Sequence, residues 1–204
     1  METSNHSGNE LMEKSPRKKN QKTLWQRFQS GDEDAFFEIY QENHALLFNY
    51  AIRLSSNEEL SRDCIHDMYL ELWEKKGKLK SLENFKPYLF KFLRNIVIDK
   101  IKEHHKLIGE SNGKEPDMVI SHEDFLIGKE YKELHVQKVT QALQSLSPRQ
   151  KEVVYLKFYS NLSYKEIAEV YQINYQSVRN LMSESLKKMK ELLLFLVFVL
   201  IFWC

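Results

Sequence analysis

Six polar side chains between residues 176 and 187 are of the types that read DNA. Gln176, Arg179 and Asn180 carry groups that can pair in a bidentate manner with adenine or guanine edges in a major groove. The hydroxyl of Ser177 and the ammonium group of Lys187 suit phosphate oxygens, which set the position of a protein on a duplex. The chemistry expected here is recognition of bases, and the residues expected to carry it are Gln176, Ser177, Arg179, Asn180, Ser183 and Lys187.

A helix must present these side chains on one side. Residues 175 to 191 carry apolar residues at helical spacing, which predicts a helix with a buried stripe and a polar face opposite it. The predicted stripe consists of Val178, Leu181, Met182, Leu186 and Met189.

Three helix starts lie close together in this part of the chain. Ser147 with Gln150 and Ser163 with Glu166 both fit a capping box, which satisfies the first backbone N–H groups of a helix. Asn174 offers the cap of a third helix after a short polar break. The middle helix is expected over about residues 164 to 171, and helices connected this closely predict a helix-turn-helix. The middle helix is expected to bury Ile167, Ala168 and either Val170 or Tyr171.

Capped helices with a solvated polar face are also common in all-α proteins, so this pattern has an alternative that involves no DNA. Charge favours DNA binding, because residues 147 to 190 contain eight lysines and arginines but four acids. The segment is therefore predicted to bind DNA.

The composition of the whole chain indicates a helical protein with substantial cores. Of its 204 residues, 42% are hydrophobic and 12% aromatic, while six glycines and four prolines leave little material for tight β-turns. The net charge of +1 argues against a protein that coats nucleic acid nonspecifically.

Cys64 and Cys204 have neither metal-ligand spacing nor the pattern of a disulfide framework, which fits a reducing cytoplasm. Residues 1–21 contain no signal-peptide core and are expected to be a disordered basic tail.

The first half of the chain shows several helical patterns. One begins at Leu24 and breaks at Ser30 and Gly31; a second runs from about residue 35 to 40 and a third from about 46 to 54. The aromatic residues of these segments, Trp25, Phe28, Phe36 and Tyr40, are expected in the core.

An acidic helix is predicted over about residues 58 to 76. Residues 57 to 74 contain six acids and one base, and four of the acids form a row at near-helical spacing. Like charges four residues apart destabilise an isolated helix, so a basic partner protein would relieve the row. A solvated face is the alternative, and metal binding is disfavoured because His66 lies at the wrong offset. The acid row is Asp63, Asp67, Glu71 and Glu74.

A basic helix is predicted over about residues 86 to 105, starting at Pro87. Residues 84 to 106 contain six bases and two acids. Such side chains, with Phe85 and Tyr88 at the edge of the preceding loop, suit a DNA backbone and an unstacked base. Periodicity is then lost over residues 106–124, which are expected to be a flexible linker.

Three motifs in this order carry a resemblance to a known family. They are SRDCIHDMYLELWEK (Ser61 to Lys75), YLFKFLRNIVIDK (Tyr88 to Lys100) and the stretch from Leu146 to Glu191. Over about residues 22–191 the chain resembles the extracytoplasmic-function (ECF) sigma factors of the sigma-70 family, which direct bacterial RNA polymerase to promoters. The resemblance implies an all-α protein of two small helical domains joined by a flexible linker, the second with a helix-turn-helix. It implies a transcription initiation factor that is no enzyme and needs no cofactor or metal.

The resemblance also assigns roles to residues. It implies that core RNA polymerase, at the clamp of its largest subunit, is bound by Asp63, Asp67, Glu71 and Trp73. The minus-ten promoter element would be recognised and opened by Lys80, Asn84, Phe85, Lys86, Arg94, Asn95 and Asp99. The six residues named first would read the minus-thirty-five element. The chain departs from its relatives at Ser183 and Glu184, where they carry a basic or aromatic pair, and an acid facing DNA repels phosphate.

The expected organisation follows from these assignments. Residues 22–105 would form sigma region 2 and residues 125–191 sigma region 4, with an anti-sigma factor as a further partner. Residues 192–204 are uninterruptedly apolar, and a helix of that length would reach about 20 Å against a hydrocarbon core of about 30 Å. Burial of this tail or contact with a partner is favoured, within a cytoplasmic protein. The alternative is peripheral contact with the inner membrane.

One other class of function stays open. A helix-turn-helix regulator could bind an operator through residues 146–191 and use residues 22–105 to sense a ligand or dimerise. The acid row and the basic helix favour the sigma factor, and no Gly-rich phosphate loop or nucleophile constellation points to an enzyme.

Overall fold

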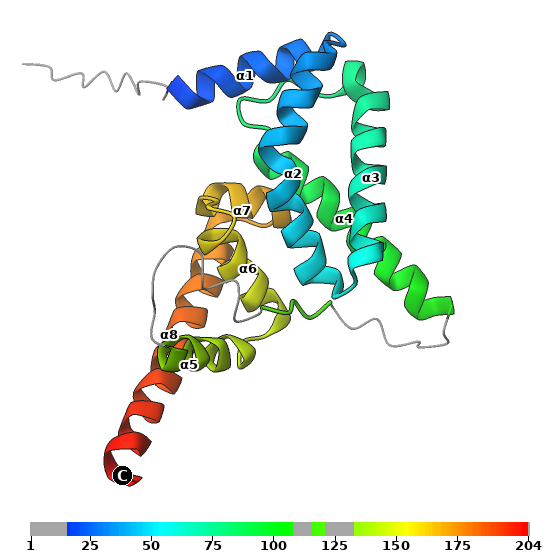
Figure 1. Cartoon of the computed structure of the whole chain (residues 1–204). Helices are drawn as coiled ribbons and strands as arrows, with labels where there is room; N and C mark the ends of the chain where they lie inside the picture. The colour runs from blue at the N-terminus through cyan, green and yellow to red at the C-terminus, as the bar shows by residue number, and fades with distance from the viewer. Residues whose placement is uncertain (1–15, 108–115, 121–132, 204) are drawn as a thin grey trace, which may run out of the picture.

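The computed structural model describes the backbone of residues 16–107, 116–120 and 133–203, and the regular structure in these ranges is helical throughout (Figure 1). The predicted all-α class is confirmed. Side chains are described for residues 20–107, 116–120 and 139–191.

The first domain is a helical bundle. Three of its helices, α2, α3 and α4, pack against one another, and α1 lies across one end of α2 (Figure 1). The predicted acidic and basic helices are confirmed as α3 and α4. The elements are α1 (Pro16–Gln29), α2 (Glu33–Ser55), α3 (Glu58–Lys75), the short 3-10 helix η1 (Lys76–Lys78) and α4 (Lys86–Leu107).

Two helix boundaries differ from the sequence-based expectation. Helix α2 is continuous where two helices were expected, because no glycine or proline interrupts residues 41–45. Helix α1 begins at Pro16, inside the stretch expected to be a disordered tail. Between the two helices Gly31 adopts a φ of 92°, which a residue with a Cβ rarely does. The Asp32 carboxylate then caps α2 by accepting a hydrogen bond from the Ala35 backbone N–H at 3.0 Å.

Aromatic side chains fill the core of this domain and hold the loop between α3 and α4. Trp25 and Phe28 are fully buried, with ring centroids 5.1 Å apart. The Trp25 indole N–H donates a hydrogen bond to the Lys80 backbone oxygen at 2.9 Å. Because α1 holds the loop in this way, the basic residues of the loop have a defined position beside α4.

The second domain contains the predicted helix-turn-helix. Both capping boxes are present, at Ser147 with Gln150 and at Ser163 with Glu166. The middle helix has the predicted bounds, and it buries Ile167, Ala168, Val170 and Tyr171. The elements are α5 (Glu133–Gln144), α6 (Pro148–Phe158), α7 (Tyr164–Tyr171) and α8 (Tyr175–Trp203).

Helix α8 differs from its prediction in two respects. Leu186 is exposed although it was expected in the buried stripe, whereas Ser185 is fully buried, with its hydroxyl donating to the Leu181 backbone oxygen at 2.6 Å. A small residue at position 185 suits the side of α8 that α5, α6 and α7 cover. The helix also continues beyond residue 191, and its C-terminal end points away from the rest of the molecule (Figure 1).

The side chains of the apolar tail, residues 192–204, lie outside the described part of the structure. Within the part of the chain that is described, no helix is both long and apolar enough to cross a membrane.

The two domains pack against each other through α4 and α7. Of the predicted linker, residues 116–120 are described, and Met118 and Ile120 are buried there. The remaining linker residues from 108 onward lie outside the described ranges.

Candidate docking and nucleic-acid interfaces

The acid row lies along α3, where the structure partly neutralises it. Asp67 accepts a hydrogen bond from the Lys100 ammonium of α4 at 2.5 Å, and Glu71 is paired with Lys75 one turn away. Burial acts to lower the pKa of Lys100, but the hydrogen bond and charge of Asp67 outweigh it and raise the pKa overall. Asp63 is exposed and forms no ion pair with another described residue. The Asp63 carboxylate, like that of the exposed Glu74, is therefore available to a basic partner.

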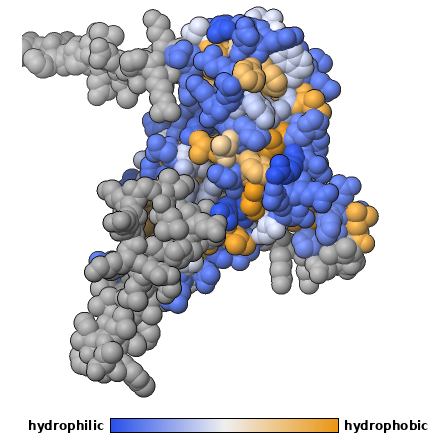
Figure 2. All heavy atoms as spheres, in the orientation of Figure 1, coloured by the Kyte–Doolittle hydropathy of each residue, from blue (hydrophilic) through white to orange (hydrophobic). Residues whose placement is uncertain are grey.

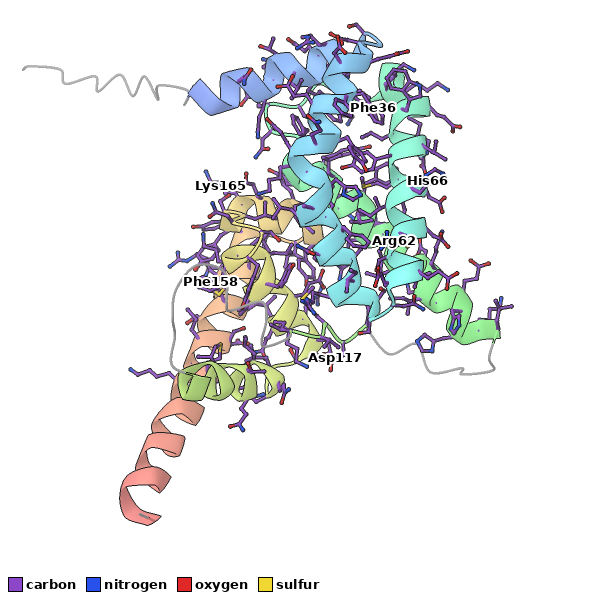
Figure 3. The ribbon with its side chains drawn as sticks, in the orientation of Figure 1. Phe36, Arg62, His66, Asp117, Phe158 and Lys165 are labelled. Carbon is purple, nitrogen blue, oxygen red and sulfur yellow. The ribbon has the colours of Figure 1, made fainter. Side chains whose placement is uncertain are left out.

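An apolar hollow of about 590 Å³ lies between α2 and α3 beside this row. Two of its apolar lining residues, Phe37 and Leu70, are 57% and 51% exposed. Figure 2 shows apolar residues along this side of the molecule, bordered by hydrophilic ones. Phe36 and His66, which also line the hollow, can be followed along the α2–α3 pair in Figure 3. A surface that combines exposed apolar groups with carboxylates is typical of a protein-docking site.

The base of the hollow is built from packed rings. Phe36 contacts Trp73 with ring centroids 5.1 Å apart and Tyr69 in an edge-on manner at 6.0 Å. Behind Phe36 lies the buried ring of Phe28, at 5.8 Å. Trp73, which was predicted to contact the partner, is therefore half-buried: its ring packs against the core and also lines the hollow.

Two residues of this hollow were not predicted from the sequence to lie on a docking surface. Phe37 was not assigned a role, and Tyr40, expected in the core, is 37% exposed. The sequence contained a signal that one of these rings is exposed. Adjacent residues such as Phe36 and Phe37 lie about 100° apart on a helix, so both cannot face the same core.

The predicted minus-ten residues lie on the loop before α4 and along α4 itself. Lys80, Asn95 and Asp99 are exposed. Phe85 is fully buried and its ring stacks on Trp25, with centroids 5.5 Å apart. The DNA-binding role expected for Phe85 is therefore corrected, because its side chain belongs to the core.

The other three members of this set contact the second domain. The Arg94 guanidinium donates to both carboxylate oxygens of Glu152, at 2.8 and 3.2 Å. The Lys86 ammonium donates to the Ser160 backbone oxygen at 2.6 Å. The Asn84 amide bonds to the Glu166 carboxylate. In this arrangement part of the minus-ten surface is covered by α6, α7 and the turn between them.

The predicted minus-thirty-five residues are brought together on the open side of α8. All are exposed except Ser177, which is half-buried. The Gln176 amide donates to Asn180 at 2.9 Å, and the Asn174 carboxamide caps the helix by accepting from the Ser177 backbone N–H at 2.7 Å. Glu184 is also exposed on this helix. The first turns of α8 thus present amide and guanidinium groups to solvent, as direct readout of bases requires.

Exposed cationic and aromatic side chains flank this face. Arg179 lies over the Tyr175 ring at 6.0 Å, and Tyr175 in turn approaches Tyr164 of α7, with ring centroids 6.4 Å apart. Lys165 and Phe158 lie on the outer side of α6 and α7 (Figure 3). Among the residues that the structure describes, no group of three or more His, Cys, Asp or Glu side chains could hold a metal ion.

Comparison with known proteins identifies the family of the chain. Residues 39–106 match the model of sigma-70 region 2 and residues 137–189 that of sigma-70 region 4, which together cover more than half of the chain. The ECF RNA polymerase sigma factor SigK of Mycobacterium tuberculosis (strain ATCC 25618 / H37Rv) is 20% identical over 177 residues, covering 83% of this chain and 91% of the relative.

Two solved structures share the fold. CnrH in complex with the cytosolic domain of CnrY superposes with a TM-score of 0.60 at 18% identity, covering 85% of this chain and 96% of CnrH. The sigma factor RpoE in complex with the anti-sigma factor NepR, from Bartonella quintana, superposes with a TM-score of 0.56 at 24% identity. The match covers 76% of this chain and 96% of that chain. With both region models matched in order and the helix-turn-helix in place, the chain belongs to the sigma-70 family and is an RNA polymerase sigma factor of the ECF type.

Proposed function

We propose that this sigma factor uses three separate surfaces to start transcription. The α2–α3 hollow with its acid row binds core RNA polymerase, the loop before α4 and the exposed side of α4 engage the minus-ten element, and α8 reads the minus-thirty-five element. The observation that carries the proposal is that the domain matching region 2 exposes both the Asp63 carboxylate of α3 and the apolar side chains of Phe37 and Leu70 in the α2–α3 hollow.

The polymerase surface combines an attractive charge with apolar contact area. A basic helix of the partner would lie along the row from Asp63 to Glu71 and place apolar side chains in the hollow beside Phe37 and Leu70. Burial of apolar area contributes about 25 cal/mol per Å², whereas the carboxylates mainly select the partner and its orientation. We assign this role to residues 22–105, together with minus-ten recognition and strand opening.

The two DNA surfaces differ in what they can read. On α8, Gln176, Arg179 and Asn180 point their polar groups away from the domain and can reach base edges. On α4 and its loop, the basic residues suit a backbone from which bases have been unstacked. We assign minus-thirty-five recognition to residues 125–191, with residues 106–124 as the connection between the two activities.

Run-off transcription with core RNA polymerase from the same organism, on a genomic promoter library, tests this function. Specific transcripts that depend on the added chain are expected, and aligning their start sites would define both promoter elements. If core polymerase neither binds the chain nor changes its output, the initiation role is wrong. A palindromic footprint in the absence of polymerase would then favour the operator-binding regulator.

Replacing Arg179 with alanine is expected to weaken binding to a duplex carrying the minus-thirty-five element by about 10- to 100-fold. A bidentate contact of this kind discriminates against a wrong base by about 1–3 kcal/mol, so the loss should disappear on a duplex changed at the contacted base. Fluorescence anisotropy with both duplexes measures this. Lys190→Ala, one exposed cation removed further along α8, is the matched control, and an equal loss for both variants would contradict base reading by Arg179.

We also propose that an anti-sigma protein binds this chain. The support comes from the two solved structures described above, one of which contains the sigma factor RpoE bound to the anti-sigma factor NepR and the other CnrH bound to the cytosolic domain of CnrY. Pull-down with the full chain from the native host, followed by mass spectrometry, identifies the partner. Recovery of core polymerase subunits without any further stoichiometric protein would count against it.

For residues 192–204 we propose contact with a protein partner rather than with the membrane. Helix α8 carries this apolar segment away from the helix-turn-helix, so the tail can be covered without disturbing the DNA-reading face. Fractionation of host cells is expected to leave the full chain outside the membrane fraction. Recovery with membranes that is lost on deleting residues 192–204 would instead establish peripheral membrane contact.

A further inference from the structure

Four side chains from both domains form a buried group, which we call the interdomain cluster: Tyr50 of α2, Arg94 of α4, Glu152 of α6 and Tyr171 of α7. The Glu152 carboxylate binds the Arg94 guanidinium through two hydrogen bonds and also accepts one from the Tyr50 hydroxyl. The Tyr171 ring lies 4.5 Å from the centre of the guanidinium. The side chains of Glu152 and Arg94 are only 5% and 19% exposed.

Three groups of the cluster, the two tyrosine hydroxyls and the guanidinium, keep a defined charge. Burial and then the charge of Glu152 raise the pKa of Tyr50 and of Tyr171, so both hydroxyls stay neutral. Burial acts to lower the pKa of Arg94, but the attraction and hydrogen bonds of Glu152 raise it overall, so the guanidinium stays charged. A buried carboxylate therefore faces one full positive charge and a neutral donor. Removing that carboxylate would leave Arg94 buried without its counter-charge.

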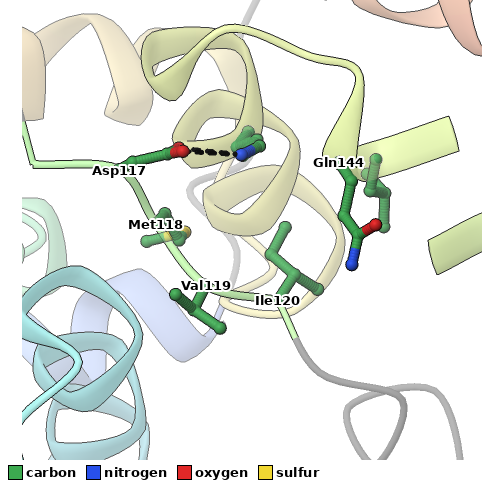
Figure 4. Close-up of a pocket in the computed structure, with 7 residues that line it drawn as sticks. Asp117, Met118, Val119, Ile120 and Gln144 are labelled. Carbon is green, nitrogen blue, oxygen red and sulfur yellow. Dashed lines mark hydrogen bonds and ion pairs between the residues drawn. The ribbon is translucent and has the colours of Figure 1, made fainter. Parts of the chain in front are cut away.

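A second contact between the domains is made by part of the linker. Residues 116–120 pass between the two domains, with Met118 buried and the Val119 backbone N–H donating to the Arg53 backbone oxygen of α2 at 2.9 Å. Asp117 forms an ion pair with Lys151 of α6 at 2.8 Å, and both residues line a cavity of about 140 Å³ (Figure 4). The linker segment thus contacts α2 on one side and α6 on the other.

These contacts cover part of one proposed DNA-binding surface and leave the other exposed. Arg94, Asn84 and Lys86 of the minus-ten set are bound by Glu152, Glu166 and the Ser160 backbone oxygen. By contrast, the base-reading side chains of α8 remain exposed. The arrangement is therefore compatible with minus-thirty-five binding and incompatible with contact of DNA at Arg94.

We propose that this closed arrangement is an autoinhibited state, in which Glu152 holds the second domain over the minus-ten surface. The inference rests on the proposed minus-ten role of Arg94, Asn84 and Lys86. Opening would expose Arg94 and Glu152 to water together, so neither charge would be left buried and unpaired. Minus-ten DNA would then bind the open form, and its apparent affinity for the chain would be reduced by the small fraction of open molecules.

The distance between the domains can be measured without reference to transcription. Spin labels at Glu74→Cys in α3 and Gln141→Cys in α5 occupy exposed positions on the two domains. Cys204→Ser removes the terminal thiol, and Cys64 is buried. Double electron–electron resonance on the full chain then gives the distribution of interdomain distances. We expect one dominant distance, corresponding to the closed arrangement.

In this labelled chain Glu152→Gln is expected to raise the ratio of open to closed molecules by at least about tenfold, because Arg94 loses its buried counter-charge. Glu42→Gln, which removes one exposed carboxylate from α2, is the matched control and should leave the distribution unchanged. Met118→Ser tests the same equilibrium through the linker segment and keeps the test valid if Glu152→Gln impairs folding of the second domain. Circular dichroism checks the helix content of each variant.

Binding of DNA to the same variants tests the inhibitory role. The probe is single-stranded DNA that carries the minus-ten element defined by run-off transcription, and fluorescence anisotropy measures its affinity for the full chain. The apparent affinity should rise by up to about tenfold in the variants that open, following the increase in the open fraction. An unchanged distance distribution in both Glu152→Gln and Met118→Ser would overturn the closed state. Opening without a gain in affinity for this DNA would overturn autoinhibition. If no form of the chain binds the DNA, the proposed minus-ten role fails, while the distance measurement still decides whether Glu152 holds the domains together.

Discussion

Asp63→Arg is expected to abolish detectable binding of core RNA polymerase while leaving the helix content of the chain unchanged. Asp63 is exposed on α3, about one turn before His66, which lines the apolar hollow, and it forms no ion pair with another described side chain. Reversing its charge would place a cation against a basic partner surface, and such like-charge contacts cost several kcal/mol. A penalty of about 3 kcal/mol corresponds to a loss in affinity of more than about 100-fold.

The control for this experiment lies on the same helix. Glu59→Arg introduces the same charge change in the first turn of α3, outside the predicted polymerase-binding set. Titration of labelled core polymerase with both variants and with the unchanged chain gives the three affinities. Equal affinity for Asp63→Arg and the unchanged chain would show that the acid row has no part in docking.

Trp73 is a less informative position for the same question. Its ring contacts Phe28 and Phe36 and lies 3.9 Å from the Lys76 ammonium. Replacing it with alanine would remove core packing together with any contact to polymerase. The exposed charge of Asp63 separates docking from stability, which the half-buried tryptophan does not.

Phe28→Ala is expected to lower the free energy of unfolding by about 3–5 kcal/mol. The Phe28 ring is fully buried between those of Trp25, Phe36 and Trp73, so its removal leaves a cavity that these large side chains cannot readily fill. A loss of this size is a large part of the about 5–15 kcal/mol by which a typical protein is stable. Urea denaturation followed by circular dichroism measures it, on the chain without residues 192–204 if the apolar tail causes aggregation.

Phe37→Ala is the matched control, since it removes the same ring from an exposed position of the neighbouring helix. Its effect on stability should stay within about 0.5 kcal/mol. Polymerase binding should nevertheless weaken, because Phe37 lines the hollow. Similar stability losses for the two variants would mean that Phe28 is not the central packing residue that the structure indicates.

Helix positions were predictable because their causes are local. Ser163 and Glu166 lie three residues apart, and a capping box needs only those two side chains and the adjacent backbone, so the bounds of α7 followed from the sequence. Apolar periodicity likewise predicted α3 and α4 closely. The helix-turn-helix, the exposed polar face of α8 and the acid row are consequences of this local information.

Contacts between distant residues could not be predicted in the same way. Arg94 and Glu152 are 58 residues apart, and nothing in the sequence around either one specifies the other. The burial of Phe85 depends on Trp25 of α1, and the exposure of Phe37 depends on which side of α2 is covered by α3 and α4.

The sequence by itself therefore determined the helices, their order, the family and the polar residues that each helix carries. Only the tertiary structure decided which of those residues face solvent, because burial is set by the packing of whole helices against one another. It also decided that part of the proposed minus-ten surface lies against the second domain while the proposed minus-thirty-five surface stays open. The buried ion pair between Arg94 of α4 and Glu152 of α6 contributes to that difference, and such a pair exists only once the two domains have packed together.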